Sequence, residues 1–406
     1  MSYIQKAFKV TLIPNHSQEV LINKTIGCAR FVYNRFLALR KELYSAEQKT
    51  LNYNACSQQL TLLKKEIEWL KEVDKFALQN SLKNLETAYK NFFSDLKKSK
   101  GKKGVGFRKF KNKHGCKQSY KTNFTNSNIQ LIENRLKLPK LGWVRFHKSQ
   151  DIIGNVVNVT ITRTNSGKYI ASILCETEIQ KYPQVSQNIG LDLGIKSYLV
   201  TSNNETVDNP KYYRTQTRKL RSYHKKLSRS VKGSSNRVKA KIKLARSYER
   251  ITNLRDDFLH KLSTRIIKEN TVICIENLRV ANMVKNHKLA LSISDASWSK
   301  FITMLEYKAL WHDRIVQKVG TFYPSSQTCN HCGFINPQVL DLKLREWSCP
   351  SCDNYNLRDV NASLNIFCEG LRILTATVGI PEALNACGEL VRPGAIQAEI
   401  VEAGIA

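Results

Sequence analysis

The sequence lacks a long apolar run, and no stretch approaches the roughly 18 consecutive apolar residues that a membrane helix needs. Its first residues, Met1 to Lys6, lack the apolar segment of a secretory signal. Without such a signal, the eleven cysteines do not indicate a disulfide framework, because disulfides persist mainly in oxidising compartments. We therefore expect a soluble, cytoplasmic protein in a reducing environment, with no membrane partner.

Acidic residues are also scarce. The 406 residues include 33 Asp and Glu against 65 Lys and Arg, which gives a formal net charge of +32. This excess is too large for an ordinary metabolic enzyme, and its field favours binding to a polyanion, for which nucleic acid is the default. The hydrophobic fraction of 42% still suffices for folded cores, so wholesale disorder is excluded. The length predicts about two to four structural units.

The first half of the chain changes from a helical to a period-two pattern. Residues 7–14 alternate like a strand, and apolar stripes further on predict amphipathic helices whose apolar faces pack in a core. Residues 116–182 alternate again and are predicted to be all-β. We expect the first strand to join this β region, so that residues 1–14 and 116–182 form a small β-barrel domain. The helical domain, residues 15–115, would then be an insertion in it.

Two segments concentrate the basic charge. Residues 97–121 hold eleven basic residues, no acid and several glycines, which predicts a flexible loop. Residues 211–250 hold fifteen Lys or Arg against Glu249, with one narrow apolar side, which predicts a helical hairpin with a cationic exterior. A solvated charge run is the alternative, but self-repulsion favours contact with phosphates. The candidate nucleic-acid-binding residues on these segments are Lys102, Lys103, Arg108, Lys109, Arg218, Arg221, Lys225 and Lys226.

Two Cys-x-x-Cys pairs form the sharpest motif. Cys329 and Cys332 are separated from Cys349 and Cys352 by sixteen residues. Each pair is typical of a zinc knuckle, and two knuckles place four thiolates tetrahedrally around Zn²⁺ at about 2.3 Å. Because all four ligands come from the protein, the predicted site is structural. Two disulfides or a chance spacing are the alternatives, and the other seven cysteines are expected to act as small apolar residues.

The second half of the chain has an α/β pattern with carboxylates at special places. Asp192 and Glu276 each end a predicted buried strand. Because the carboxyl ends of parallel neighbouring strands meet at one sheet edge, we expect these two side chains to lie together. Asp359 follows the cysteines at a helix start, and Asp295 is expected to cap a helix that begins near Trp298. The alternatives are a turn former for Asp192, a solvated strand-end acid for Glu276 and a simple helix cap for Asp359.

Three carboxylates gathered at one site would repel one another and need a counter-charge. Hard oxygen ligands select Mg²⁺ or Mn²⁺. Two such ions about 3.5–4 Å apart activate water and stabilise the leaving oxygen in phosphodiester hydrolysis. The carboxylate set therefore indicates a metal-dependent nuclease site.

Four motifs contain these acids and the first cysteine pair: Gly190-Leu-Asp-Leu-Gly-Ile-Lys196, Ile275-Glu-Asn-Leu278, Ser325-Ser-Gln-Thr-Cys-Asn-His-Cys-Gly333 and Arg358-Asp-Val-Asn-Ala-Ser363. Together they resemble the TnpB family, which consists of transposon-encoded RNA-guided DNA nucleases related to the type V CRISPR effectors. The similarity extends to residues 73–93 and 289–296 and covers about residues 5–370. Before Asp359 the family often has His-Asp-Arg-Asp, whereas this chain has Asn-Leu-Arg-Asp and keeps the acid.

The resemblance implies a multidomain α+β fold. The nuclease part would be an RNase H-like (RuvC-like) α/β domain, and the β-barrel would be a wedge domain that carries a helical recognition domain with its basic loop. The tail, residues 375–406, has no lysine and many small residues, so we expect it to be poorly ordered. In the nuclease part, the implied segments are 186–324 (with the basic hairpin at 211–265), the inserted zinc ribbon 325–356, and 357–374.

The resemblance also implies an activity and partners. The protein would be an RNA-guided DNA endonuclease with Asp192, Glu276 and Asp359 as a triad for two Mg²⁺ or Mn²⁺ ions, and one structural Zn²⁺. It would bind a guide RNA from the transposon end and double-stranded target DNA, with one protein copy per RNA, at the nucleoid of a prokaryotic cell. A short flanking DNA motif would be read by the helical domain. The matching residues are Tyr53, Lys75, Phe76 and Gln79, with core packing for Phe76 and ordinary surface for the others as the alternatives.

Two other functions share part of this pattern. An RNA-guided repressor with a silent nuclease site should have lost one acid, yet all three are present. An unguided, structure-specific nuclease would be purified without a discrete RNA. The sequence shows no separate Tyr or Ser nucleophile motif, so strand transfer is expected to belong to another protein.

Overall fold

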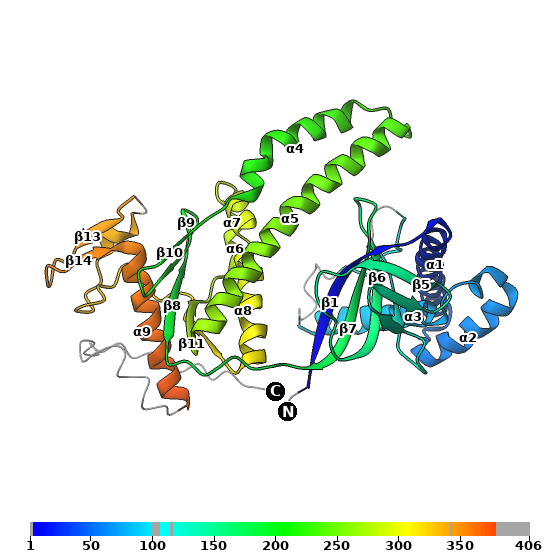
Figure 1. The fold of residues 1–406 in the computed structure, drawn as a ribbon, viewed down its shortest axis with the longest axis horizontal. Helices are drawn as coiled ribbons and strands as arrows, with labels where there is room; N and C mark the ends of the chain where they lie inside the picture. The colour runs from blue at the N-terminus through cyan, green and yellow to red at the C-terminus, as the bar shows by residue number, and fades with distance from the viewer. Residues whose placement is uncertain (1–2, 99–105, 114–116, 342, 379–406) are drawn as a thin grey trace. The chain divides into compact units, whose positions relative to one another are not determined.

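The computed structural model describes residues 3–98, 106–113, 117–341 and 343–378 (Figure 1). The chain divides into two compact units, Met1–Ile179 and Gln180–Ala406. Both units combine helices and sheet, so the α+β class expected from the sequence is confirmed. None of the helices in the described ranges is both long and apolar enough to cross a membrane.

A seven-stranded sheet forms the base of the first unit. Its strands are β1 (Tyr3–Ile13), β2 (Gln118–Asn123), β3 (Gln130–Ile132), β4 (Arg135–Leu138), β5 (Gly142–His147), β6 (Asn155–Arg163) and β7 (Tyr169–Glu178). They are ordered β2-β6-β7-β1-β5-β4-β3, and every pair is antiparallel. The strand that begins the chain therefore lies in the middle of the sheet. This order places β2 and β3 at opposite ends and does not by itself close the sheet into the expected barrel.

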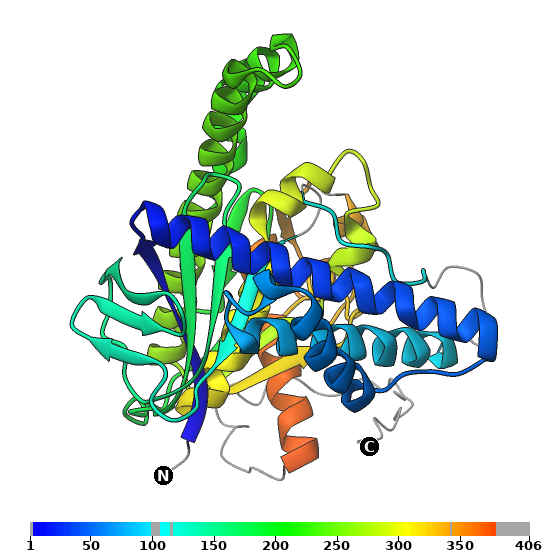
Figure 2. The ribbon, with the colours of Figure 1, turned by 90° about the vertical axis from the view of Figure 1, so that its right-hand side faces the viewer.

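Three helices lie between β1 and β2 in the chain: α1 (His16–Glu47), α2 (Tyr53–Glu66) and α3 (Lys75–Lys98), with a short 3-10 helix, η1 (Glu68–Leu70). Asn15 starts α1 by accepting a 2.9 Å hydrogen bond from the Gln18 amide, while the Gln18 side chain accepts one from Asn15. Apolar residues of the three helices pack in one core. Figure 2 shows the ribbons of these helices. The amphipathic helices expected here are confirmed.

The loop expected for residues 97–121 is contradicted only at its two ends, and residues 99–105 and 114–116 of it lie outside the described residues. Lys97 and Lys98 end α3, and Lys121 lies in β2. Residues 106–113 have no regular secondary structure, but Asn34 of α1 binds both backbone groups of Lys111. Local charge suggested a loop, whereas a side chain distant in sequence fixes the segment.

The second unit contains a five-stranded mixed sheet. Its strands are β8 (Asn188–Leu193), β9 (Ser197–Thr201), β10 (Thr206–Asp208), β11 (Val272–Glu276) and β12 (Ile315–Val319), in the order β10-β9-β8-β11-β12. The pairs β8–β11 and β11–β12 are parallel, and the other two are antiparallel. Parallel neighbours require crossover connections, which the helices of this unit provide.

Helices cover both faces of this sheet. The described helices of this unit are α4 (Tyr212–Arg229), α5 (Ser235–Glu269), α6 (Val280–Met283), α7 (Ala290–Ala296), α8 (Trp298–His312) and α9 (Arg358–Val378), of which α5 and α8 pack on one face and α9 on the other. In β11, Ile273 and Ile275 belong to the core with α5 and α8, whereas Val272 and Cys274 belong to the core with α9. This alternation follows the period of two in a strand and confirms that the strand is buried on both faces.

Helix α9 lies unusually close to the sheet at two glycines. A Cβ atom at Gly190 of β8 would lie 2.2 Å from the carbonyl oxygen of Ser363. A Cβ atom at Gly370 of α9 would lie 2.4 Å from the sulfur of Cys274. The helix extends to Val378, so residues 375–378 of the expected disordered tail are helical, and the rest of that tail, from residue 379, lies outside the described residues.

Helices α4 and α5 form the basic hairpin expected from the sequence, and α5 extends four residues beyond the predicted end, to Glu269. The hairpin projects from the sheet of this unit (Figure 1). Its narrow apolar contact is formed by Leu220, Leu244 and Ile251. With so small a core, the hairpin depends on its anchorage at the base.

Asp295 provides that anchorage, so the predicted cap of the helix at Trp298 is wrong. Helix α8 begins after Ser297 without a side-chain cap. The Asp295 carboxylate, 3% exposed, instead accepts hydrogen bonds from the Tyr213 amide at 3.0 and 3.1 Å, and from the Arg255 guanidinium at 2.8 Å. Helix α4 starts at Lys211, whose φ is +47° and whose side chain offers no cap, so a distant carboxylate fills that role.

Replacing Asp295 by alanine is expected to lower the free energy of unfolding by about 3 kcal/mol, because it leaves the largely buried Arg255 guanidinium and the amides of Tyr213 and Arg214 without their acceptor. Denaturant unfolding followed by circular dichroism measures the change. Asp256→Ala is the matched control, since Asp256 on α5 pairs with Lys300 in a more exposed ion pair. The control should cost less than about 1 kcal/mol. Equal losses in the two variants would contradict the capping role.

Candidate functional site

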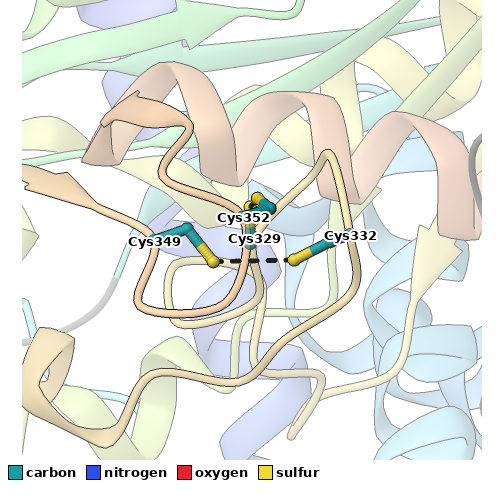
Figure 3. A group of neighbouring side chains, drawn as sticks. All are labelled: Cys329, Cys332, Cys349 and Cys352. Atoms are coloured by element: carbon teal, nitrogen blue, oxygen red, sulfur yellow. Dashed lines mark hydrogen bonds between the residues drawn. The ribbon is translucent and has the colours of Figure 1, made fainter.

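The four cysteines of the predicted ribbon converge in the structure (Figure 3). Their sulfur atoms all lie within 4.8 Å of one another. The Cys332 and Cys349 sulfurs are 3.5 Å apart, and the Cys329 and Cys352 sulfurs are 3.8 Å apart. For Zn–S bonds of about 2.3 Å, the edge of a tetrahedron is about 3.8 Å long. The four thiolates therefore fit a zinc ion, and they are not joined as disulfides.

Two similar turns hold these cysteines. The Cys329 amide donates to the Phe334 carbonyl at 2.8 Å, and the Cys349 amide donates to the Asn354 carbonyl at 2.9 Å. Each turn has a left-handed residue directly after its second cysteine, Gly333 and Asp353. Two short strands and a 3-10 helix complete the ribbon: β13 (Glu346–Ser348), β14 (Tyr355–Leu357) and η2 (Pro337–Leu340). Its apolar core is very small, so the metal would supply most of its cohesion.

Asp192 and Glu276 lie at the same edge of the second sheet. In the parallel pair β8–β11, Leu191 is opposite Ile275. The next residue on each strand is the acid, so Asp192 and Glu276 follow side by side. Leu191 and Ile275 face α5 and α8, and by the alternation of a strand the two acids point to the other face, which α9 covers.

Asp359 is the second residue of α9, which crosses that face. Since Gly190 lets α9 approach β8, the start of the helix comes to the carboxyl edge where the other two acids lie. The Arg345 guanidinium is 3.1 and 3.4 Å from the two Asp359 carboxylate oxygens. Among the described residues, only the four cysteines form a set of His, Cys, Asp or Glu ligand atoms within 4.8 Å of one another, so the three carboxylates are more widely spaced.

The pKa values of Asp192 and Glu276 are raised at this edge of the sheet. Burial raises the pKa of the Asp192 carboxyl well above its ordinary value, and the charges of Glu276 and Asp359 raise it further. The guanidinium groups of Arg358 and Arg345 oppose that shift. Burial also raises the pKa of Glu276, and a hydrogen bond from Ser325 acts in the opposite direction. Negative charge at this edge is thus only partly compensated, and hard oxygen donors of this kind suit a divalent cation such as Mg²⁺.

Hydrogen bonds connect the ribbon to the carboxylates. The Ser325 hydroxyl donates to Glu276 at 2.6 Å. Asn365 of α9 donates to the carbonyl of Ser325 at 2.8 Å, and Asn361, two residues beyond Asp359, donates to the carbonyl of Thr328 at 2.7 Å. The folded ribbon therefore helps to orient two of the three acids.

The sequence pattern did not predict the roles of these supporting residues. Ser325 and Asn361 lie inside motifs that were recognised, but the motifs do not indicate which acid or carbonyl they contact. Arg345 lies between the cysteine pairs and has no distinguishing pattern. The only available signal was its position a few residues before the second pair, which is too common to be informative.

Three of the residues expected to read a flanking motif lie on the first unit's helix α3, and the fourth, Tyr53, is the first residue of α2. Lys75, Gln79 and the neighbouring Lys83 follow at intervals of four and share one face of that helix. The Lys83 ammonium is 5.7 Å from the centroid of the Tyr53 ring. Tyr53 and Lys75 thus mark two ends of a row about 12 Å long.

An open pocket of about 480 Å³ lies at the Lys75 end of this row. Lys75 and Phe76 line it, whereas Tyr53 and Gln79 do not. Its wall also includes the buried carboxylate of Asp74, whose Oδ1 accepts a 2.9 Å hydrogen bond from the Phe76 amide. The other lining residues are Lys64, Lys71, Val73, Thr125, Asn126, Asn128, Pro139 and Lys140.

The basic candidates are distributed over both units. In the first unit, Lys109 is exposed and the Arg108 guanidinium lies 5.8 Å from the centroid of the Phe92 ring. Lys102 and Lys103 lie outside the described residues. In the second unit the four candidates on α4 all point to solvent: Arg218, Arg221, Lys225 and Lys226.

Three families match parts of the chain. Residues 172–287 match a family described as "Probable transposase" (OrfB_IS605), and residues 298–366 match "Cas12f1-like, TNB domain". Residues 1–49 match a family described as a helix-turn-helix domain. In this structure that last range contains β1 and the single long helix α1.

Two curated relatives match nearly the whole chain. A Streptomyces pristinaespiralis protein named "Putative RNA-guided DNA endonuclease" is 37% identical over 97% of this chain and 93% of its own length. The Escherichia coli K12 protein of the same name, InsQ, is 33% identical over 96% of this chain and 95% of its own. A mimivirus TnpB-like protein, L79, is 28% identical over 52% of this chain and 42% of its own length.

Fold, ribbon and relatives together define the class, a multidomain α+β protein of IS605-type transposons with a four-cysteine metal-binding module. The chain belongs to the TnpB family.

Two solved structures align with most of the chain at low similarity. One, described as the mini-RNA-guided endonuclease CRISPR-Cas_phi3, covers 90% of this chain and 92% of its own, with a TM-score of 0.47 and 10% identity. Another, described as a Cas12f1–sgRNA–target DNA complex, covers 89% and 98%, with a TM-score of 0.35 and 16% identity. Scores this low decide nothing about the present chain.

Proposed function

We propose that this protein is an RNA-guided, metal-dependent DNA endonuclease encoded by an insertion sequence. The observation that carries the proposal is the cluster of three acids at one sheet edge, which stays undercompensated in a chain of net charge +32. A structural role would favour pairing each acid with one of the many available cations. The family relatives named as RNA-guided DNA endonucleases support the same reading.

In this proposal, Asp192, Glu276 and Asp359 hold two Mg²⁺ or Mn²⁺ ions. The ions would supply activation of water and stabilisation of the leaving oxygen in phosphodiester hydrolysis. The Ser325 hydroxyl orients Glu276, and the Arg345 guanidinium binds the carboxylate of Asp359. We further propose that this unit is the RuvC-like, RNase H-like nuclease domain.

The remaining candidates would hold nucleic acid. The cationic outer face of α4 would bind phosphates of the guide RNA and its DNA partner, and the first unit would act as wedge and recognition domains. Pairing with the guide would read the target, while the protein reads backbone shape and one short flanking motif. The pocket lined by Lys75 and Phe76, together with Gln79 of α3 and Tyr53 of α2, is the proposed reader of that motif.

Purification of the full chain with its native transposon end tests the proposal. A discrete RNA derived from that end should copurify, with one protein copy per RNA. Replacing the guide segment of this RNA should redirect Mg²⁺-dependent cleavage to a plasmid that carries the new matching sequence. Cleavage that ignores the guide would indicate an unguided nuclease, and guided binding without cleavage would indicate a repressor.

A further inference from the structure

Residues 106–113 form an irregular segment that contacts the helices of the first unit. The Asn34 side chain donates to the Lys111 carbonyl and accepts from the Lys111 amide, both at 2.8 Å. The Lys111 ammonium lies 3.8 Å from the centroid of the Tyr33 ring. These contacts come from α1 and hold the segment in a defined position.

Two phenylalanines on this segment have different surroundings. Phe107 packs edge-on against Tyr89 and Phe92 of α3, with ring centroids 5.9 and 5.2 Å apart. Phe110 lies over the Lys41 ammonium, 4.7 Å from its ring centroid, and is 53% exposed. The Lys41 ammonium also lies 5.1 Å from the centroid of Phe107. Phe107 is itself 45% exposed, but its contacts with two rings of α3 anchor the segment, while Phe110 presents an aromatic ring to solvent.

The surroundings of Phe110 are cationic. No acid occurs from Lys97 to Lys121, and the closest acid in sequence, Asp95, is exposed on α3. Lys109 is exposed, and the Arg108 guanidinium lies 5.8 Å from the centroid of the Phe92 ring. Together with the Lys41 ammonium beside the Phe110 ring, these cations favour an anionic group at this surface.

A ligand for this surface needs two properties. It must offer a flat face to an exposed ring, and it must carry negative charge within reach of a guanidinium. A peptide with an aromatic and an acidic residue meets both only at isolated points, whereas an unpaired nucleotide joins a base to a phosphate in every unit. Aromatic platforms beside cationic grooves are the usual means of binding single strands.

We propose that Phe110 stacks on an unpaired base of single-stranded nucleic acid and that Arg108 binds the adjoining phosphate. Phe107 and Asn34 position the segment. This inference rests on the proposed function, which supplies two such strands, the unpaired part of the guide RNA and the displaced DNA strand. It adds a stacking site to the phosphate contacts that basic charge alone predicts.

The test compares three variants of the full chain, Phe110→Ala, Phe110→Leu and Phe110→Tyr, with fluorescent mixed-sequence oligonucleotides of about 16 nucleotides as probes. The alanine variant should lose about five- to hundredfold in affinity for the preferred single strand. The leucine variant should lose as much, because it keeps apolar area without a flat ring, and the tyrosine variant should retain wild-type affinity. Separate RNA and DNA arms identify the strand, and blunt duplex DNA should bind equally to all variants.

Ile132→Ala is the matched control, since Ile132 of β3 is an exposed apolar residue, 56% exposed, in the same unit. It should leave single-strand affinity unchanged. Ultraviolet crosslinking and peptide mapping of the wild-type complex should place a nucleotide on Phe110. Crosslinks confined to other segments, or a leucine variant that binds like wild type, would overturn the inference. Neither readout depends on cleavage, so absence of guided cleavage would refute the proposed function and leave this result standing.

Discussion

Asp192→Asn is expected to reduce guided DNA cleavage by about a thousandfold or more while leaving RNA binding nearly unchanged. Asparagine preserves the size of the side chain but removes one anionic ligand from between Glu276 and Asp359. Metal ions contribute several kcal/mol of transition-state stabilisation, and each 1.36 kcal/mol is a factor of ten in rate. Single-turnover cleavage of a matched plasmid, with excess protein–RNA complex, measures the loss.

The matched control is Asp208→Asn, which removes an exposed carboxylate from β10 of the same sheet. It should cleave at the wild-type rate. An Asp192→Asn protein that still cleaves within tenfold of wild type would refute the catalytic assignment of the edge. Loss of copurifying RNA in that variant would instead show that the substitution disturbs the whole protein.

The same substitution should stabilise the metal-free protein. The folded state raises the pKa of Asp192 above its unfolded value, mainly through burial. As pH rises through the unfolded and then the folded pKa, the unfolded chain releases its proton first, so the free energy of unfolding falls. At neutral pH this cost is present in wild type and absent in the asparagine variant, whose Tm in EDTA should be higher. Mg²⁺ should raise the Tm of wild type more than that of the variant.

Two features of the candidate sites could be predicted from the sequence, because a local motif determines one and a general rule of sheet topology determines the other. The cysteine pairs are short-range motifs, and their convergence needs only that the two turns face each other. The rule that parallel strands end at a common edge predicted that Asp192 and Glu276 would be neighbours. The register of β8 and β11 confirms that placement.

It failed where the partner is distant in sequence and of an ordinary type. Asp295 precedes Trp298 like a helix cap, yet it binds the Tyr213 amide and Arg255. Asn34 is one polar residue among many on α1, and nothing in its neighbourhood predicts that it holds Lys111. Helical periodicity indicates which face is buried, but it does not identify which polar side chains bridge elements far apart in the chain.

Cys349→Ser is expected to abolish zinc binding and to reduce guided cleavage by about a hundredfold or more. Structural zinc contributes about 10–16 kcal/mol to the folding of small zinc modules, and β13 and β14 are only three residues long. Unfolding the ribbon would release the Ser325 hydroxyl from Glu276 and the Arg345 guanidinium from Asp359. At a metal site, loss of each such supporting contact lowers metal affinity or activity by about 10- to 100-fold.

Elemental analysis measures the zinc content of this variant, limited proteolysis measures the folding of its ribbon, and cleavage assays measure its activity. Zinc content should fall from one ion per chain to none, and proteolysis should become rapid between Cys329 and Cys352 while the rest of the second unit stays resistant. Cys368→Ala, a half-buried cysteine of α9 outside the ribbon, should keep its zinc and its activity. A Cys349→Ser protein that loses zinc but cleaves normally would show that the ribbon does not support the carboxylates. Since Asn361 and Asn365 connect the ribbon to the first turns of α9, we expect the two sites to fail together.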